Sequence, residues 1–440
     1  MSEKEKVNIE EQKTKRINRI LSIVIAVLLT FIGFLGGYFA KYFSKTESEK
    51  TIEELISIII DKAYPIDEGK EIDERAVFEF FKTYYDDKYA AYYDKDEYEQ
   101  LQREDNGNYS GIGVSFYSNA KNEVSKVYKN SPAFMAGFQK NDVFVSITDA
   151  NGAKTVFDKQ NNPTSYLPSV NEGEVITVEV NRQGETIHLQ VEKRQYNASY
   201  VEYYDSGTKM FFATNDFGNL EAKTDDLQKM EGLDDLTAYV ILDQFEAQAS
   251  EEFGKAIKFM QERGRTKLIL DLRDNGGGSM KILVKIASYL IYNSGARESI
   301  VAYAKGKDRT SFFSTSSNNY YTGITKTVVI ANHNTASASE CLIGLMLHYG
   351  KKSIDDNFSK DDLVITKNNE GVAKTYGKGI MQTTYRLKSG GAFKLTTAKI
   401  LWPDNSTCIH DVGIIQDKNL DNAVTEANAL SRAIEICNNA

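Results

Sequence analysis

Two serines and an acid stand close together in HNTASASECLIGL, which runs from His333 to Leu345 and leads into an expected helix. A serine hydroxyl is a nucleophile when a base takes its proton and N–H groups bind the oxyanion that forms. Small hydroxyl residues are also common at helix starts, where they accept N–H groups of the first turn. Taken alone, this stretch therefore leaves Ser337 and Ser339 open as nucleophile or cap, while Glu340 suits the positive end of a helix.

Three side chains are candidates for the base. His333 and His410 do not stand in a recognisable triad order, and both fit solvated turns. A lysine must be neutral to accept a proton, which requires burial to lower its pKa by several units from about 10.4. Lys378 lies between two glycines before an apolar strand in KTYGKGIMQTTYRL. Gln382 is expected on the same strand face, where it would hydrogen-bond the amine.

A run of glycines supplies a candidate oxyanion site. Gly276, Gly277 and Gly278 in DLRDNGGG fall between an expected strand and an expected helix. Such a run lets the backbone approach closely and directs several N–H groups at one place. The spacing of a phosphate-binding loop is missing, because no Lys-Ser/Thr pair follows. By itself the run predicts either a tight turn or a site, and Asp271 and Arg273 are expected to fix that turn.

Hydrophobic patterning places these stretches in a mixed architecture. From Thr237 onward, short β-branched runs such as TAYVILDQF and TKLILDLRD alternate with longer amphipathic runs. This alternation predicts an α/β domain on a partly parallel sheet, whose sites lie beyond the carboxyl ends of the strands. Residues 109–192 show short alternating runs separated by Gly, Asn and Pro, which is typical of a small β-rich domain. Residues 48–105 carry apolar residues three and four apart, which predicts helices.

The first fifty residues predict a membrane anchor. Residues 20–40, ILSIVIAVLLTFIGFLGGYFA, are uncharged and long enough to cross a hydrocarbon layer of about 30 Å. A cleaved signal peptide is the alternative, but no cleavage site of the Ala-x-Ala kind follows. The residues before the span are more basic than those after it: Lys13, Lys15, Arg16 and Arg19 against Lys41 and Lys45. This bias places the N-terminus in the cytoplasm and the rest of the chain outside.

The composition of the chain limits which classes of partner and cofactor we expect. The 440 residues suffice for two or three domains, and a net charge of −9 argues against a nucleic-acid partner. Three cysteines (Cys341, Cys408 and Cys437) show no metal-type spacing and indicate no disulfide framework. Four histidines without an HExxH pattern give no metal site. We expect neither a metal nor an organic cofactor.

The β-rich segment resembles a PDZ domain. The resemblance covers residues 108–196 and rests on YSGIGVSF followed by NSPAFMAGFQKNDVFVSI. It implies that the N–H groups of the loop Gly111, Ile112, Gly113 and Val114 receive the C-terminal carboxylate of a peptide, which adds as a strand to the sheet edge. An unspecialised β-domain with glycine turns is the alternative.

The order of motifs in the α/β part resembles the carboxyl-terminal processing proteases. These are the tail-specific serine endopeptidases of peptidase family S41, with a Ser/Lys dyad on a crotonase-like core. TAYVILDQF, LILDLRDNGGG, NTASASE, TYGKGIMQ, LTTAKILWPDNS and IHDVGIIQD follow one another over residues 237–420. The resemblance implies that Ser337 is the nucleophile, Lys378 the general base and Gln382 its support. It assigns the oxyanion hole to the backbone N–H groups of Ala338 and Gly277.

Together these features predict five segments. They are a cytoplasmic N-terminus (1–19), a transmembrane signal anchor (20–40), a helical segment (48–107), a PDZ-like domain (108–196) and a protease domain with a C-terminal helix (197–440). The predicted function is a membrane-anchored, extracytoplasmic serine endopeptidase that selects protein substrates by their C-terminal tails. The alternative is a catalytically silent or latent peptide-binding scaffold on the same fold. The C-terminal helix could mediate a homodimer or pack within one subunit, and Arg273 could sense the PDZ-like domain.

Two departures from the family pattern stand out. The spacing between Ser337 and Lys378 is longer than the family's, and the excess falls in the polar stretch 353–373, which we expect to be a surface insertion. Gln416 stands in GIIQD where the family has proline. We expect this second change to affect a loop more than the chemistry.

Overall fold

The computed structural model describes residues 16, 19–30, 46–62, 73–117, 122–158, 161–207, 209–213, 230–291, 298–315, 319–350, 358–416 and 424–439. The chain divides into two compact units, Met1–Tyr84 and Tyr85–Ala440. The first unit contains a helix at residues 19–30, α2 (Glu47–Lys62) and nearly all of α3 (Glu74–Tyr85). Within the described residues no helix has both the length and the apolar character to span a membrane, and residues 31–40 of the predicted anchor lie outside them.

The centre of the second unit is a six-stranded sheet. Its strands in spatial order are β11 (Met210–Ala213), β10 (Val201–Asp205), β12 (Thr237–Leu242), β13 (Lys267–Asp271), β16 (Lys326–Ala331) and β17 (Leu363–Ile365). The last four run parallel, and β10 is antiparallel to both of its neighbours. The predicted partly parallel α/β sheet is confirmed.

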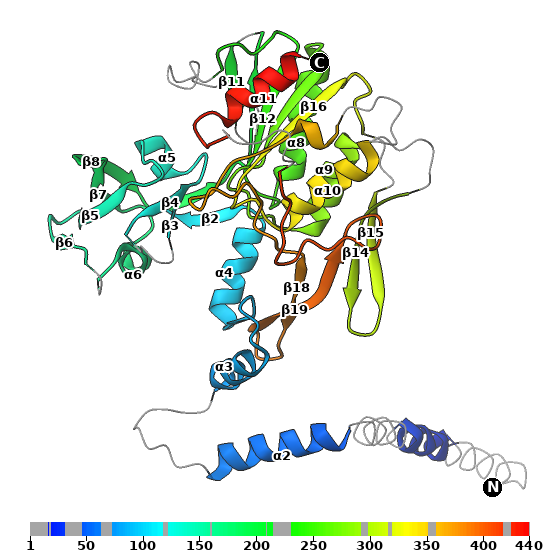
Figure 1. Ribbon diagram of the computed structural model, residues 1–440. Coiled ribbons are helices and arrows are strands. Elements are labelled where there is room, and N and C mark those ends of the chain that lie inside the picture. The colour runs from blue at the N-terminus through cyan, green and yellow to red at the C-terminus, as the bar shows by residue number, and fades with distance from the viewer. Residues whose placement is uncertain are drawn as a thin grey trace, which may run out of the picture. The chain divides into compact units, whose positions relative to one another are not determined.

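Helices cover both faces of this sheet. The helices α8 (Ala249–Glu262), α9 (Met280–Leu290) and α10 (Ala338–Gly350) share one hydrophobic core with it, and α11 (Ala429–Asn438) packs on the other face (Figure 1). Successive strand residues alternate between the two cores, so that Leu268 faces one and Ile269 the other. The apolar side of α11, with Leu430 and Ile434, is thus used within the subunit.

A second sheet contains an unexpected strand from the N-terminal segment. It is formed by β14 (Ser299–Gly306), β15 (Thr310–Thr315), β18 (Ile380–Arg386) and β19 (Ala392–Leu401), together with β1 (Ala91–Tyr93), which pairs with β19. The expected helical segment 48–107 thus contains helices that this short strand interrupts. Helix α3 ends at Tyr85, Asp86 has a φ of 51°, and a capping box at Asp94 starts α4 (Lys95–Asp105) anew.

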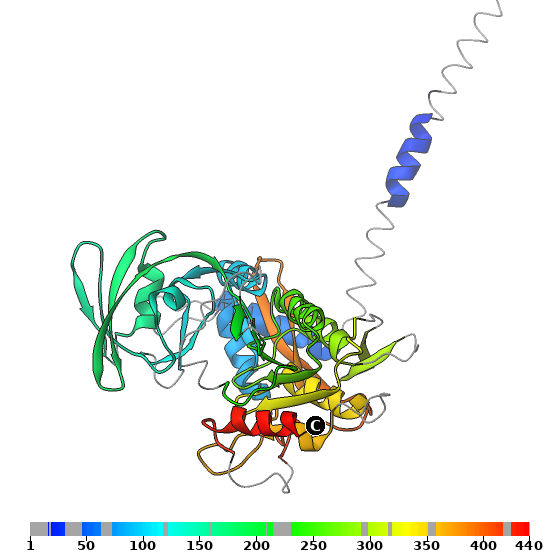
Figure 2. The ribbon, with the colours of Figure 1, turned by 90° about the horizontal axis from the view of Figure 1, so that it is seen from above.

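The β-rich segment runs from β2 (Asn108–Gly111) to β9 (Arg194–Asn197). A ribbon of β2 and β9 joins it to the rest, and β3 (Val114–Phe116) pairs with β4 (Val124–Val127). Its main sheet has the order β6 (Lys154–Val156), β5 (Val143–Thr148), β7 (Val175–Arg182) and β8 (Glu185–Glu192), visible from above in Figure 2. A short helix, α5 (Pro132–Ala136), follows Ser131 and ends at Gly137 with a φ of 89°. Two further short elements are α6 (Pro163–Tyr166) and the 3₁₀ helix η1 (Leu167–Ser169).

The stretch between Ser337 and Lys378 is more than a surface insertion. After the 3₁₀ helix η2 (Lys360–Asp362), β17 continues the central sheet beside β16, and its three residues are buried. Three consecutive apolar residues within this polar stretch, Leu363–Ile365, are the sequence pattern that indicates the strand. Gln416, the other departure, accepts a hydrogen bond from Ile365 N at 2.6 Å. The longer connection between Ser337 and Lys378 and the glutamine in GIIQD, the two departures from the family pattern, are therefore in contact with each other.

Replacing Gln416 by alanine should destabilise the protein by about 1–3 kcal/mol, because the buried N–H of Ile365 would lose its acceptor. Urea unfolding followed by tryptophan fluorescence measures the change, since the single tryptophan, Trp402, lies in the same unit. The exposed Gln261→Ala is the matched control and should stay within about 0.5 kcal/mol of the parent. Equal midpoints for both variants would contradict a supporting role for Gln416.

Candidate active site

The predicted nucleophile occupies a sharp turn. Ser337 lies between the end of β16 and the start of α10, and its φ of 58° is in the left-handed region, which costs energy for a residue with a β-carbon. Gly277 packs directly against this turn. A β-carbon on Gly277 would lie 2.7 Å from Ser337 Cβ and 2.8 Å from Ala338 N, so only glycine fits there. The two stretches singled out in the sequence are thus neighbours in space.

The two predicted oxyanion donors differ in their surroundings. Ala338 provides the first N–H of α10, which has no acceptor within its own helix. Gly277 donates its N–H to Asn275 Oδ1 at 2.9 Å. In this conformation Ala338 is the better placed of the two, and Gly277 would have to exchange Asn275 for an oxyanion.

The carboxylate of Glu340 joins the nucleophile to the predicted base. It is fully buried, and its Oε2 accepts the N–H groups of Ser337 (2.8 Å) and Lys378 (2.9 Å). Its Oε1 accepts the N–H of Gly377 (2.8 Å) and the hydroxyl of Thr375 (2.6 Å). Since one oxygen atom binds both backbone nitrogens, the two segments lie against each other. The sequence placed Glu340 only as a helix-start acid and missed this contact.

Lys378 lies in the extended segment just before β18. Its Nζ is 4.7 Å from the centre of the Tyr89 ring. Burial lowers the pKa of Lys378, and the positive charge of Lys394 lowers it further. This is the direction that a general base needs, because a lower pKa leaves more of the amine neutral.

Gln382, the predicted support of the base, hydrogen-bonds a threonine of the neighbouring strand. Its amide Nε2 donates to Thr396 Oγ1 at 3.1 Å. Lys378 precedes β18, and a bulge falls between Met381 and Gln382. Thr396 is in turn held by Asp87, which accepts both its N–H and its hydroxyl.

The two histidines stay outside this arrangement. His333 is exposed, with its ring 6.1 Å from that of Tyr376. His410 has its Nε2 3.5 Å from Asp411. In the described part of the chain no hydrogen bond joins either histidine to Ser337.

The remaining polar residues of the two stretches are structural. Arg273 binds Asp271 through Nε and Nη2 and reaches the carbonyl of Glu426 with Nη1. Ser339 is fully buried and donates its hydroxyl to Asn275 O at 3.1 Å, so it ties α10 to the glycine turn and does not cap the helix.

The β-rich domain touches the site through the residue after Arg273. Lys140 forms an ion pair with Asp274, with Nζ 2.6 Å from Oδ2. The other oxygen of Asp274 accepts the side-chain amides of Asn332 (3.0 Å) and Asn334 (2.8 Å), which precede Ser337. Arg273 was the residue expected to sense this domain, but the observed contact belongs to Asp274.

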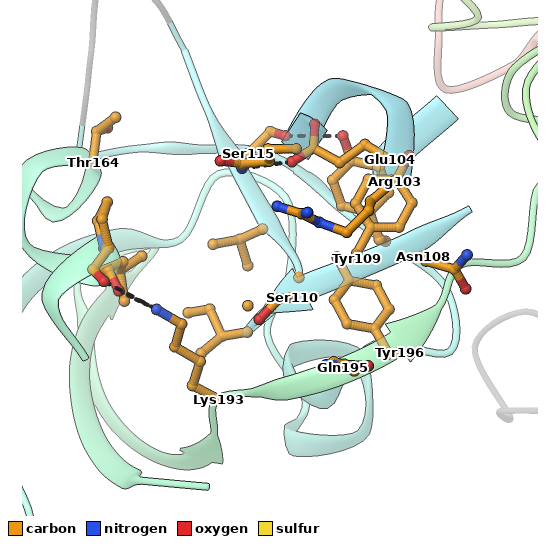
Figure 3. A pocket seen from close by; sticks show the side chains of 18 of the residues that line it. Arg103, Glu104, Asn108, Tyr109, Ser110, Ser115, Thr164, Lys193, Gln195 and Tyr196 are labelled. Atoms are coloured by element: carbon orange, nitrogen blue, oxygen red, sulfur yellow. Dashed lines mark hydrogen bonds between the residues drawn. The ribbon is translucent and has the colours of Figure 1, made fainter. Parts of the chain in front are cut away.

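A cavity of about 790 Å³ lies in the β-rich domain, apart from Ser337 and Lys378 (Figure 3). The predicted loop Gly111–Val114 lines it, and α4 contributes Arg103 and Glu104. Gly113 has a φ of 90°, and a β-carbon there would lie 2.1 Å from Ser131 Cβ. Lys193, at the rim, donates to the carbonyls of Leu167, Pro168 and Val170, which fixes η1.

Residues 236–354 and 371–420 match the model of peptidase family S41. These residues form a peptidase family S41 domain. The matched ranges leave out 355–370, which contain η2 and β17. The chain is accordingly a serine-type peptidase, as its motif order predicted.

The chain is similar to several named proteins. The chain is 25% identical over 415 residues to a protein named probable CtpA-like serine protease of Staphylococcus saprophyticus, covering 92% of this chain and 74% of the relative. A protein of the same name from Staphylococcus aureus strain MSSA476 is 26% identical over 426 residues, covering 94% and 75%. Among solved structures, the photosystem II D1 C-terminal processing protease is 18% identical, with a TM-score of 0.49 over 87% of this chain and 90% of that one.

Replacing Glu340 by glutamine should destabilise the S41 domain by about 3 kcal/mol and greatly reduce its activity. The backbone N–H groups that donate to the buried carboxylate would face the NH₂ group of the amide, which cannot accept their hydrogen bonds. Urea unfolding and labelling of Ser337 by a fluorophosphonate measure the two effects. The exposed Glu370→Gln is the control. Parent-like labelling of E340Q would show that the carboxylate does not organise the site.

Proposed function

We propose that this protein is a serine endopeptidase with a Ser337/Lys378 dyad. Ser337 attacks the peptide carbonyl while neutral Lys378 takes its proton, and the Ala338 N–H binds the oxyanion. Lys378 then protonates the leaving amine, and water hydrolyses the acyl-enzyme. The observation that carries the proposal is the Glu340 carboxylate, which binds the N–H groups of both dyad residues.

The β-rich domain of this protease acts as a PDZ-like reader of C-terminal tails. The loop Gly111–Val114 forms one wall of the cavity, and β3 pairs only with β4 among the described strands, so its other edge is available for a peptide strand. Val114, Phe116 and Leu167 make part of the lining apolar. The substrates are therefore proteins with an accessible, apolar C-terminus.

The apolar residues 20–40 anchor the enzyme in the cell membrane with the S41 domain outside the cytoplasm. The support for this part is the sequence: an uncharged stretch of membrane-spanning length with the stronger basic cluster before it.

Ser337→Ala and Lys378→Ala should each reduce cleavage of an unfolded protein with an apolar C-terminus by at least about a thousandfold, because each removes one member of the dyad. Mass spectrometry of the product termini measures cleavage. The exposed Ser311→Ala and Lys388→Ala serve as controls. Cleavage by both dyad variants at the parent rate would reject the assignment, and a parent that never cleaves would favour the silent scaffold.

Amidation of the substrate's C-terminus should raise KM by about tenfold or more and leave kcat less changed. The loop N–H groups would lose the charge-assisted part of their hydrogen bonds to the carboxylate. Steady-state kinetics on a peptide pair that differs only in this group measures the effect. Identical KM values would argue that the cavity does not read the tail.

A further inference from the structure

The predicted base is covered by a residue from outside the matched S41 ranges. Tyr89 lies in the loop between α3 and β1, far from Lys378 in the sequence, and its ring centre is 4.7 Å from the lysine Nζ. Both residues belong to the second compact unit. The covering ring is therefore supplied by the N-terminal segment that the sequence placed in helices.

This loop is fixed at both ends. On one side, Asp87 accepts the N–H of Thr396 (2.9 Å), the hydroxyl of Thr396 (3.1 Å) and the N–H of Tyr89 itself (3.0 Å). On the other side, β1 follows directly and pairs with β19. A ring held between two such attachments keeps one position over the lysine. Thr396 also accepts a hydrogen bond from Gln382, which connects the loop to the residue that the sequence assigned to the support of Lys378.

The ionisable groups around the amine are few in the described structure. Lys394 of β19 carries the one charge that shifts the pKa of Lys378, and it lowers that pKa in addition to burial. Burial raises the pKa of Tyr89, Tyr376 raises it further, and Lys88 lowers it. Lys88 is exposed, and it faces Tyr376 and Asp411.

The ring has two opposing effects on the amine. It excludes water, which disfavours the ammonium form, and its π face attracts a cation, which favours that form. Burial is the leading influence on the pKa of Lys378 and acts toward the neutral amine, which is the direction that exclusion of water by the ring would give.

We propose that Tyr89 is a positioning residue of this protease, whose ring shields Nζ of Lys378 from water and keeps the amine neutral and in place. The proposal rests on the proposed Ser337/Lys378 mechanism. It means that a residue of the segment before β1, outside the residues that match the S41 model, contributes to catalysis.

Three substitutions separate the properties of the ring. Tyr89→Phe keeps the ring, Tyr89→Leu keeps apolar cover without a π face, and Tyr89→Ala opens the amine to water. The pH dependence of kcat/KM reports the neutral fraction of Lys378, because activity rises as the amine loses its proton. In Tyr89→Ala we expect the rising limb of the pH profile of kcat/KM to move to a higher pH by about one unit or more, which lowers kcat/KM at pH 7 by about tenfold. In Tyr89→Phe and Tyr89→Leu we expect the rising limb to stay near that of the parent.

The outcomes distinguish the alternatives. A rising limb that moves down in both Tyr89→Ala and Tyr89→Leu would mean that the ring binds the ammonium, which overturns the proposal. An unmoved limb with a uniform loss of kcat would mean a structural role only and would also overturn it. The exposed Tyr385→Ala is the control, and thermal melts exclude unfolding.

A second readout keeps the test independent of activity. The amine of Lys378 can be titrated by NMR after ¹³C reductive methylation, with Lys378→Arg to assign the signal. A higher titration midpoint in Tyr89→Ala than in the parent supports the shielding role, and an equal or lower midpoint rejects it. If the parent shows no Ser337-dependent cleavage, the proposed function fails while this titration still decides the effect of Tyr89.

Discussion

The arrangement of the site depends on one buried carboxylate. A carboxylate removed from water is stable only when its oxygens are fully hydrogen-bonded, and Glu340 achieves this with four donors. The donors come from two segments, the turn at Ser337 and the extended segment Thr375–Lys378. Folding cannot satisfy Glu340 without bringing these segments together. The requirement to solvate a buried charge thus sets the relative position of the proposed nucleophile and base.

A second carboxylate extends this arrangement to the β-rich domain. Asp274 precedes the glycine turn and accepts side chains from Lys140 and from the segment leading to Ser337. Burial raises the pKa of Asp274, but its hydrogen bonds from Asn334 and Lys140 outweigh burial and lower it. Its charge therefore persists at acidic pH and keeps the domain contact. The domain that carries the peptide cavity and the turns that carry Ser337 and Gly277 meet at this residue.

The sequence predicted the features that follow from local hydrophobic patterns and motif order. It did not predict the contacts between residues that lie far apart in the chain. The α/β alternation, the β-rich domain and the candidates Ser337 and Lys378 each follow from spacing or motif order. The role of Glu340 does not, because its donors lie on a segment far along the chain. Tyr89 was missed because an aromatic-rich stretch suits a helix and a short strand equally well. The bulge beside Gln382 could not be predicted either, because only the hydrogen-bond ladder reveals a shift in register.

The added strand β17 belongs to the framework that holds Lys378. Gln416 binds the N–H of Ile365 with its side chain and the carbonyl of Ala373 with its own N–H. Two residues earlier, the N–H of Ile414 donates to Thr375 Oγ1, and that hydroxyl donates to Glu340. The contacts run without a break from the edge of the central sheet to the buried carboxylate. A longer connection between Ser337 and Lys378 is compatible with the same site because its extra residues extend the sheet behind the lysine segment and reinforce it.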